Sequence, residues 1–406
     1  ITCRDWSSDV CSSDLSEYYG LRGAYFPHTA YPVEMTMNPY PVPTWGWEIC
    51  ETPWSVQGLW WHYLYSMDMD FLRETAFTPI KEAVLFLVDY MKRPQAHGAG
   101  WKDDRYHIFP TVPPELYGLK PGFKYNYDCL VDLTLTRFIF KAFQDASSLL
   151  RVQKQEAVLL RDVADILAHF PDYPTAPTPE GPVFVSVPGE RSDVVYNVPN
   201  NLMTVFPGAE HGLHSCEDIL QQLRRSYRTI RIEGGNELVF LNLQAARIGA
   251  LDLDKWQRQA EYCRLPNGTY TDMALQVHGR YSDTTPYDFM KNMGIWFENF
   301  GMPVVINECL LQSYNGVLRL FPNWPQHKKA LFYDLRAVGA FLVSAEMSAG
   351  KVQWISIKSE KDGTVRLYAP WPAGTVFRIN DKTERVASPI IEWPSRAGAT
   401  VRLAQP

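Results

Sequence analysis

Two glutamates are placed for acid–base chemistry in this 406-residue chain. Glu115 follows two prolines in the segment PTVPPE, and Glu298 lies in GIWFENFGMP. Hydrolysis of a glycosidic bond needs one carboxylic acid to protonate the leaving oxygen and a second group that activates water or attacks directly. An apolar, aromatic neighbourhood would keep Glu115 protonated near neutral pH and suit it to the role of the acid. A solvated loop glutamate is the alternative at this position.

Loops rich in Trp, Tyr, His and carboxylates are typical of carbohydrate binding. The flat C–H faces of sugar rings stack on indole, and sugar hydroxyls need polar partners. Some of the tryptophans could instead anchor the core at a helix start, with Trp45 and Trp47 the best placed in a loop. The candidate substrate-binding residues are His28, Glu34, Trp45, Trp47, Trp61, His62, Glu210, His211, Trp296 and Asn299.

Composition argues against several other classes of function. The net charge is -6 and no run of Lys or Arg occurs, so nucleic acid is not an expected partner. No apolar run is long and charge-free enough to span a bilayer. The cysteines are scattered without a metal-binding spacing, so the sequence predicts no metal site. No phosphate-loop or dinucleotide motif is present, and we expect no cofactor.

Large apolar residues recur at helical spacing along most of the chain. The segments 54–68 and 71–92 are separated by a short polar turn and predict an antiparallel helix pair. Glu298 falls in the loop before the last helical segment, where Pro303 is well placed to start the helix. The remaining predicted helices are 127–150, 152–170, 216–227, 236–249, 254–264 and 302–314.

Repeated helix hairpins predict a mainly α fold, an incomplete (α/α)6-toroid-like helical barrel whose inner helices surround a pocket. The loops between the pairs are long and aromatic, which favours functional loops. From residue 326 the pattern changes to period two, with turns at AGK, KDG and PAG. We therefore expect a helical catalytic domain at 16–325 and a C-terminal antiparallel β-domain at 326–406.

One segment carries a specific resemblance to a known family. NFGMPVVINECLLQSYNGVLRLFPNWP (299–325) resembles the NFG…EMLLQS segment of glycoside hydrolase family 95, the α-L-fucosidase and α-L-galactosidase group. Four other segments of the chain resemble family segments more weakly, and they occur in the same order as in the family: HTAYPVEM, WSVQGLWWHYLYSMD, PTVPPE and LRAVGAF. The resemblance implies an (α/α)6 barrel, inverting and exo-acting removal of a terminal sugar from a glycan, and an extracellular or periplasmic setting. It places the general acid at Glu115.

The chain departs from the family pattern at several positions. The position of the family's water-activating Asp is Phe297 here, and the neighbouring Glu298 is the candidate base. The family's His-Arg-His segment corresponds to YNVPNNLMTVFPG, which lacks basic residues. The family's Asn-x-Asn pair would lie upstream of residue 16. Fucose is therefore one candidate sugar among several.

The first 15 residues differ in character from the rest. They are rich in Ser and Asp and show no periodicity, and DWSSDVCSSDL (5–15) matches the translation of a sequencing-library adapter. We interpret residues 1–15 as a non-native arm and expect the natural chain to be truncated at its start. A natural arm is the alternative.

Three functions fit the sequence. A glycoside hydrolase is the leading hypothesis, with an oligosaccharide or polysaccharide glycan as its partner. A non-catalytic carbohydrate-binding descendant would explain the missing Asp and basic residues. A polysaccharide lyase or phosphorylase on the same toroid is the third, because Tyr117 and Tyr125 supply loop tyrosines.

Overall fold

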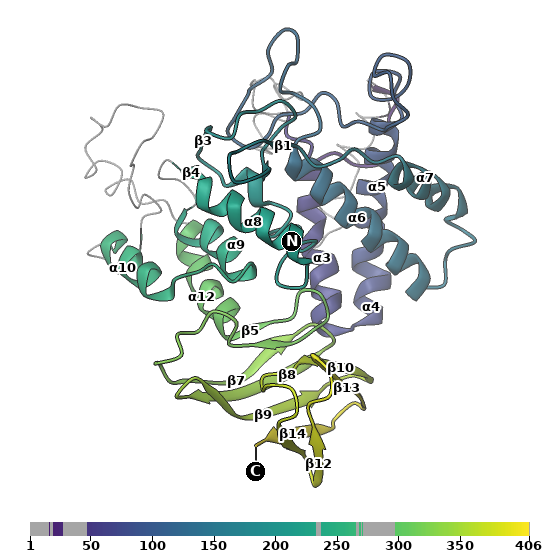
Figure 1. Cartoon of the computed structure of the whole chain (residues 1–406). Helices are drawn as coiled ribbons and strands as arrows, with labels where there is room; N and C mark the ends of the chain where they lie inside the picture. The colour runs from purple at the N-terminus through teal and green to yellow at the C-terminus, as the bar shows by residue number, and fades with distance from the viewer. Residues whose placement is uncertain are drawn as a thin grey trace. The chain divides into compact units, whose positions relative to one another are not determined.

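The computed structural model describes residues 16, 19–26, 47–232, 237–264, 268, 270 and 297–405. The chain divides into two compact units, and Figure 1 labels most of their helices and strands. The first unit consists of Ile1–Tyr63, Asp68–Glu210 and Gln221–Arg231. The second consists of Leu64–Met67, His211–Leu220 and Ile232–Pro406.

The first unit is mainly helical. Its helices are α3 (Glu51–Ser66, whose last turn falls in the second unit), α4 (Met69–Phe71), a π-helical turn (Leu72–Ala76), α5 (Phe77–Met91), α6 (Leu130–Leu149), α7 (Ala157–Ala168) and a 3₁₀ turn (Asn200–Leu202). Helix α8 (Glu217–Thr229) contributes residues to both units. The short strands are β1 (Thr175–Ala176), β2 (Val183–Phe184), β3 (Val195–Tyr196) and β4 (Arg231–Ile232).

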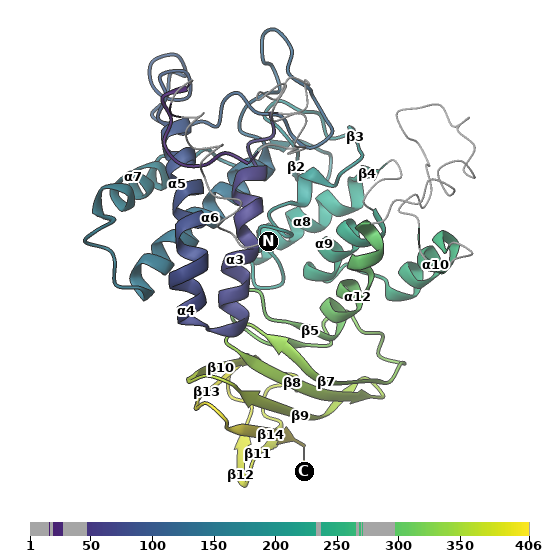
Figure 2. The same ribbon diagram turned by 180° about the vertical axis from the view of Figure 1, so that it is seen from behind.

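Helix α5 is central to the core of this unit. It packs against both α6 and α7, and its buried residues include the consecutive Phe86, Leu87 and Val88, so apolar side chains cover more than one face of the helix. Asp68 caps the start of α4, the short helix before α5, since its Oδ1 accepts hydrogen bonds from the backbone N–H groups of Asp70 and Phe71 at 3.0 Å. Figure 2 shows α3 and α5 next to each other, joined at one end by α4.

The second unit contains the C-terminal sheet and the remaining helices. The helical elements are a π-helical turn (Glu237–Leu241), α9 (Asn242–Arg247), α10 (Leu253–Cys263) and α12 (Phe297–Leu310). The strands are β5 (Leu311–Gln312), β6 (Arg319–Leu320), β7 (Ala330–Ala337), β8 (Phe341–Ser348), β9 (Lys351–Ser359), β10 (Gly363–Tyr368), β11 (Val376–Ile379), β12 (Lys382–Arg385), β13 (Ile390–Ser395) and β14 (Thr400–Ala404).

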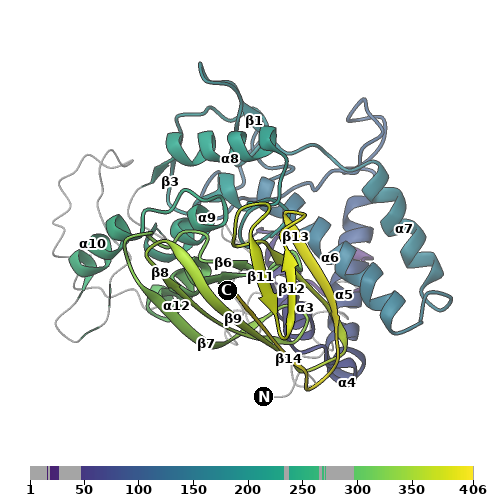
Figure 3. The ribbon, with the colours of Figure 1, turned by 60° about the horizontal axis from the view of Figure 1, so that its bottom comes forward.

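The main sheet is antiparallel and six-stranded, in the order β12-β11-β14-β9-β8-β7 (Figure 3). Strands β10 and β13 form a separate antiparallel pair that shares one apolar core with it. The alternation of buried and exposed residues along β9 and β10 follows from the two-residue side-chain period of a strand. A C-terminal antiparallel β-region is therefore confirmed.

Helix α12 differs from the prediction. It begins at Phe297, so Glu298 is a helix residue rather than a loop residue, and Pro303 lies inside the helix rather than at its start. Close packing holds the first turn in place, because a Cβ added at Gly301 would stand only 2.6 Å from Cγ1 of Val239. Tertiary contact thus outweighs the cost of an internal proline.

Membrane-crossing segments were sought among the described helices. None of these helices has both the length and the apolar character that a bilayer span requires.

Candidate functional site

Glu115 lies in the connection between α5 and α6, and four hydrogen bonds hold that connection in place. The backbone N–H of Val112 donates to the carbonyl of Trp47 at 3.0 Å, and Asn200 Nδ2 donates to the carbonyl of Pro114 at 2.9 Å. Thr111 N–H donates to the Asn126 carbonyl at 2.9 Å, and Asn126 Nδ2 donates to the Tyr117 carbonyl at 2.6 Å.

The backbone at Glu115 is in the left-handed region, with φ at 58°. This conformation is uncommon for a residue with a side chain, and such positions are enriched at functional sites where the surrounding structure holds them. Tyr117, two residues later, also has a positive φ of 49°. The chain therefore maintains a strained backbone at the residue that the sequence assigns as general acid.

The carboxylate of Glu115 is exposed, not enclosed by the apolar neighbours that the sequence suggested. Its Oε2 accepts a hydrogen bond from Asn197 Nδ2, so a residue beyond β3 orients the side chain. Pro113 and Pro114 are buried, but they do not cover the side chain of Glu115. Glu115 is thus oriented and open to a ligand.

Glu48 is a buried carboxyl group beside the same connection. Its exposed fraction is 1 %, and its side chain forms hydrogen bonds with the Glu51 side chain and with the backbone of Glu115. Burial raises the pKa of Glu48 to about 8, and those hydrogen bonds only partly oppose the rise. The nearby charge of Asp132 adds to it. Burial therefore favours the protonated form of Glu48.

Asp132 is the second buried carboxyl group at this place. It lies in the first turn of α6 and is fully buried. The Thr111 hydroxyl donates to its Oδ2 at 2.7 Å. Burial raises the pKa of Asp132 to about 7, against hydrogen bonds from Thr111, the Cys129 thiol and the backbone of Cys50.

The donor atoms of Glu48, Cys50 and Glu51 lie within 4.8 Å of one another. Metal ligands must give up their protons to bind a cation. Burial raises the pKa values of both Glu48 and Cys50, which favours their protonated forms. This cluster is better suited to holding a proton than to holding a cation.

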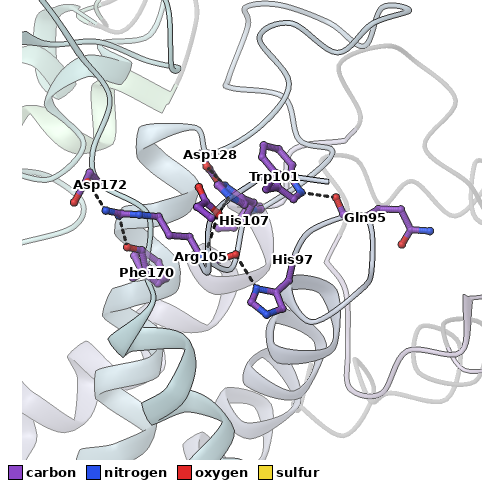
Figure 4. A network of polar contacts seen from close by, with 10 residues as sticks. Gln95, His97, Trp101, Arg105, His107, Asp128, Phe170 and Asp172 are labelled. Carbon is purple, nitrogen blue, oxygen red and sulfur yellow. Dashed lines mark hydrogen bonds and ion pairs between the residues drawn. The ribbon is translucent and has the colours of Figure 1, made fainter. Parts of the chain in front are cut away.

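A second polar network anchors the start of the connection (Figure 4). His107 is buried, with Nδ1 2.6 Å from Asp128 Oδ2 and Nε2 3.2 Å from Asp103 Oδ1. The Trp101 ring stacks on His107 with 3.8 Å between centroids. Burial alone would lower the pKa of His107, but the hydrogen bonds and charges of Asp128 and Asp103 outweigh it and raise that pKa. The network ties residues 101–107 to the segment that enters α6.

We expect Asp128→Asn to lower the free energy of unfolding by about 1–3 kcal/mol at pH 6, because a buried charge-assisted hydrogen bond is weakened. His107 binds its proton more tightly in the folded chain than in the unfolded one. Its contribution is therefore complete below its ordinary pKa of 6.5 and is lost as pH rises through the higher folded value. Burial also raises the pKa of Asp128, so the contribution of Asp128 to stability likewise falls as pH rises. The loss caused by the variant should shrink by pH 9.

Urea unfolding of both proteins at pH 6 and pH 9 measures this difference. Asp172→Asn is the matched control, because Asp172 is exposed and pairs with Arg105 at 2.8 Å on the same network. An exposed pair contributes about 0–1 kcal/mol, so this variant should unfold almost like the parent. Equal destabilisation by Asp128→Asn at both pH values would contradict the role given to His107.

Glu210 is held by two partners within the first unit. Arg137 Nη1 donates to its Oε1 at 2.9 Å, and the Tyr173 hydroxyl donates to its Oε2 at 2.5 Å. The guanidinium of Arg137 also lies over the Tyr173 ring, 5.0 Å from the centroid. Both oxygens of Glu210 are therefore already engaged by protein groups.

The aromatic candidates lie in different surroundings. Trp61 is half-buried, with Phe206 stacked and Phe138 edge-on at 6.3 Å each, which matches the core-anchor alternative. Trp47 is half-buried and donates from Nε1 to the Tyr90 hydroxyl at 2.9 Å. His62 is exposed, with its ring 4.0 Å from that of Phe71. Their role in binding sugar stays a prediction.

The other predicted site residues are not brought together by the described structure. His211 is half-buried and belongs to the second unit. Glu298 and Asn299 lie in α12, but their side chains are outside the described residues. His28, Glu34, Trp45 and Trp296 also lie outside the described residues.

Sequence reasoning gave no role to Glu48 and did not consider Asp132. In the sequence Glu48 and Glu51 are two of several acidic residues close to the aromatic loops, and Asp132 stands in an apolar helix where a single acidic residue draws little attention. One signal was present: an acidic residue on the apolar face of α6 needs a buried partner. Its partner Thr111 comes from a different part of the chain.

Comparison with known proteins agrees with the sequence resemblance. Residues 7–178 match the glycosyl hydrolase family 95 catalytic domain, a range that includes Glu115. The match begins inside the arm at 1–15 that we set aside, and the boundary of that arm stays a prediction. The chain is 23% identical over 334 residues to alpha-L-fucosidase 2 of Arabidopsis thaliana. That alignment covers 77% of this chain and 36% of the relative, so the chain spans about a third of the curated protein it matches.

Two solved structures are similar in part. One is a protein from the human microbiome assigned as a kojibiose phosphorylase, with a TM-score of 0.43 and 11% identity over 86% of this chain and 47% of that one. The other is a GH127 β-L-arabinofuranosidase from Geobacillus stearothermophilus T6, with a TM-score of 0.26 and 12% identity over 86% of this chain and 53% of that one. The family match and the plant relative together confirm the resemblance found in the sequence: the chain is related to glycoside hydrolase family 95.

Proposed function

We propose that the protein is a glycoside hydrolase in which Glu115 protonates the glycosidic oxygen of a glycan. The observation that carries the proposal is the conjunction of the family match with the geometry of Glu115. An exposed carboxylate stands on a strained backbone, and Asn197 orients it. Such an arrangement fits a general acid that must meet a substrate from outside the fold.

The finer features of the proposal come from the family. The reaction is inverting and exo-acting, Glu298 or another carboxylate activates water, and fucose or a related sugar is released. The described helices form part of an (α/α)6 toroid, and the whole protein works outside the cytoplasm on oligosaccharides or polysaccharides. Fucose is supported by the likeness to alpha-L-fucosidase 2, which applies to about a third of that relative's length.

A panel of α- and β-linked glycosides tests the function, using the full-length natural protein and following the product by NMR. We expect release of a terminal sugar whose first-formed anomer has the configuration opposite to that of the substrate, because an inverting enzyme adds water in a single displacement. A first-formed anomer of retained configuration would reject the inverting mechanism. No sugar release from any member of the panel would reject the hydrolase.

One observation favours a second candidate. Phe297 occupies the position of the family's water-activating Asp, and a phenyl ring cannot remove a proton. A carbohydrate-binding protein without hydrolytic activity would keep the aromatic loops and lose the base. Binding of a glycan by calorimetry, together with no sugar release between pH 4 and pH 9, would support this alternative.

A further inference from the structure

We propose that the outer face of the C-terminal sheet binds an acidic polysaccharide. Trp354 and Tyr333 stack on its sugar rings, and Arg378 and Arg402 pair with the carboxylates that those sugars carry. The site belongs to the second unit, whereas Glu115 belongs to the first. Its ligand class, a glycan, rests on the proposed function, but the site holds a polymer and takes no part in the reaction.

The strand register places these side chains on one face of the sheet. Strands β7, β8, β9, β14 and β11 are neighbours in that order (Figure 3). One row of directly paired residues crosses all five strands: Leu331, Glu346, Trp354, Ala404 and Arg378. The residues next to them along the chain belong to the apolar core of the sheet: Phe332, Ala345, Ile355, Leu403 and Phe377. Because successive side chains of a strand point to opposite faces, the row stands on the outer face.

Two aromatic rings meet on the β7 and β9 part of this face. The ring centroids of Tyr333 and Trp354 are 6.2 Å apart, and the ring planes are inclined by 36°. The exposed fraction of Tyr333 is 66 %, and that of the neighbouring Leu331 is 51 %. Trp354 Nε1 donates to Glu346 Oε2 at 2.8 Å, which holds the indole in place. The pair offers a fixed aromatic surface of the kind on which the C–H faces of sugars stack.

Polar groups that suit sugar hydroxyls lie beside these rings. Within the described part of the chain, the second oxygen of Glu346 and the hydroxyl of Tyr333 have no hydrogen-bond partner. Both can therefore bond to a ligand. Glu346 and Asp334 place the acidic groups on β8 and β7, at the opposite side of the sheet from β14 and β11.

Arginines occupy that opposite side of the outer face. Arg378 pairs with Ala404, and Arg402 lies two residues before Ala404, so the two arginines are diagonal neighbours on β11 and β14. Both are exposed, and neither forms an ion pair with another described residue. Lys358 on β9 is the diagonal neighbour of Arg402 and adds a third positive charge. The guanidinium fork matches a carboxylate, so this part of the face favours an anionic ligand.

The two halves of the face together fit an extended acidic glycan better than other ligands. Strands lie about 4.8 Å apart, so the surface from β8 to β11 extends over about 14 Å. A neutral glycan would leave the arginines without a counter-ion. The net charge of the chain is -6, so its composition does not explain a local group of cations. Single-stranded DNA could use the same groups, but the match to a glycoside hydrolase family favours the glycan.

Calorimetry with the full-length natural protein tests the charge. Polygalacturonate is one probe and alginate a second, and highly methyl-esterified polygalacturonate is the matched control because it keeps the sugar chain and loses the carboxylates. We expect polygalacturonate to bind about tenfold or more tightly than the ester, and to weaken as salt is raised to about 0.5 M. No binding of either acidic polysaccharide, or equal binding of the ester, would overturn the proposal. Tighter binding of single-stranded oligo(dT) would overturn the glycan as ligand.

Substitution of Tyr333 tests the aromatic contact. Tyr333→Ala should weaken binding of polygalacturonate by about tenfold, and Tyr333→Phe, which keeps the ring, by less than about twofold. The high exposure of Tyr333 makes both variants safe for folding. Tyr368→Ala is the matched control, since Tyr368 is 50 % exposed on β10, outside the six-stranded sheet. Equal effects of Tyr333→Ala and Tyr368→Ala would overturn the aromatic contact.

The double variant Arg378→Ala/Arg402→Ala tests the cationic half. We expect it to bind polygalacturonate about tenfold more weakly and to bind the ester almost as the parent does. Arg366→Ala is the control, because Arg366 is an exposed arginine of β10 that already pairs with Glu392. An unchanged preference for the acidic polymer in the double variant would overturn the assignment of the arginines.

These titrations need no turnover, so they separate this site from the proposed function. A protein that releases sugar from small glycosides but binds neither acidic polysaccharide would overturn the site alone. A protein inactive on every glycoside would reject the hydrolase. Binding of polygalacturonate by that inactive protein, weakened by Tyr333→Ala, would still support the site.

Discussion

We expect Glu115→Gln to lower kcat on unactivated glycosides by about 10²–10⁴-fold, the range that general acid catalysis contributes. The glutamine amide has nearly the shape of the carboxyl group, and its oxygen can still accept the hydrogen bond from Asn197 Nδ2. It has no acidic proton to give to the leaving oxygen. The variant should therefore fold normally and bind substrate, and lose only the protonation step.

A leaving group that needs no proton sharpens the test. A glycosyl fluoride or a dinitrophenyl glycoside departs without assistance, so Glu115→Gln should retain most of the parent's activity on it. Glu74→Gln, an exposed glutamate in the same unit, should keep full activity on both substrates. Equal losses on both substrates would indicate damage to binding, and undiminished turnover of the unactivated glycoside would reject Glu115 as the acid.

The second large effect is expected in the second unit. Arg247 is buried and forms an ion pair with the half-buried Glu308, with Nη2 of Arg247 2.7 Å from Oε1 of Glu308. The guanidinium also lies 4.4 Å from the centroid of the Tyr314 ring. Removal of Arg247 leaves the Glu308 carboxylate, whose side chain is only 12% exposed, without its counter-ion. We expect Arg247→Leu to lower the free energy of unfolding by about 3–5 kcal/mol.

Urea unfolding followed by circular dichroism measures this effect. The double variant Arg247→Leu/Glu308→Leu should recover a large part of the loss, because a buried pair can be replaced by apolar side chains at little cost. Lys328→Leu is a control from the same unit, since Lys328 pairs at the surface with Asp254. A loss below about 1 kcal/mol for Arg247→Leu would contradict the importance of the pair.

Local patterns predicted the elements well where the signal repeats along the chain. The spacing of apolar residues in 71–92 and 127–150 corresponds to α5 and α6, and the alternation in 351–360 corresponds to β9. These signals are local because a helix or a strand repeats its buried face every few residues. The predicted start of α12 was wrong. The preference of proline for the first turn of a helix is also a local signal, and it takes no account of the packing of Gly301 against Val239.

The sequence by itself determined the class of the elements, the C-terminal sheet, the relationship to glycoside hydrolase family 95 and the candidacy of Glu115. Only the tertiary structure decided that Glu115 is exposed and that Glu48 and Asp132 are buried carboxyl groups with raised pKa values. The physical reason is that a carboxyl group's proton affinity depends on the water and the charges around it. For Glu48 those surroundings come from α3, α6 and the Glu115 connection, which are far apart in the chain and meet only when it folds.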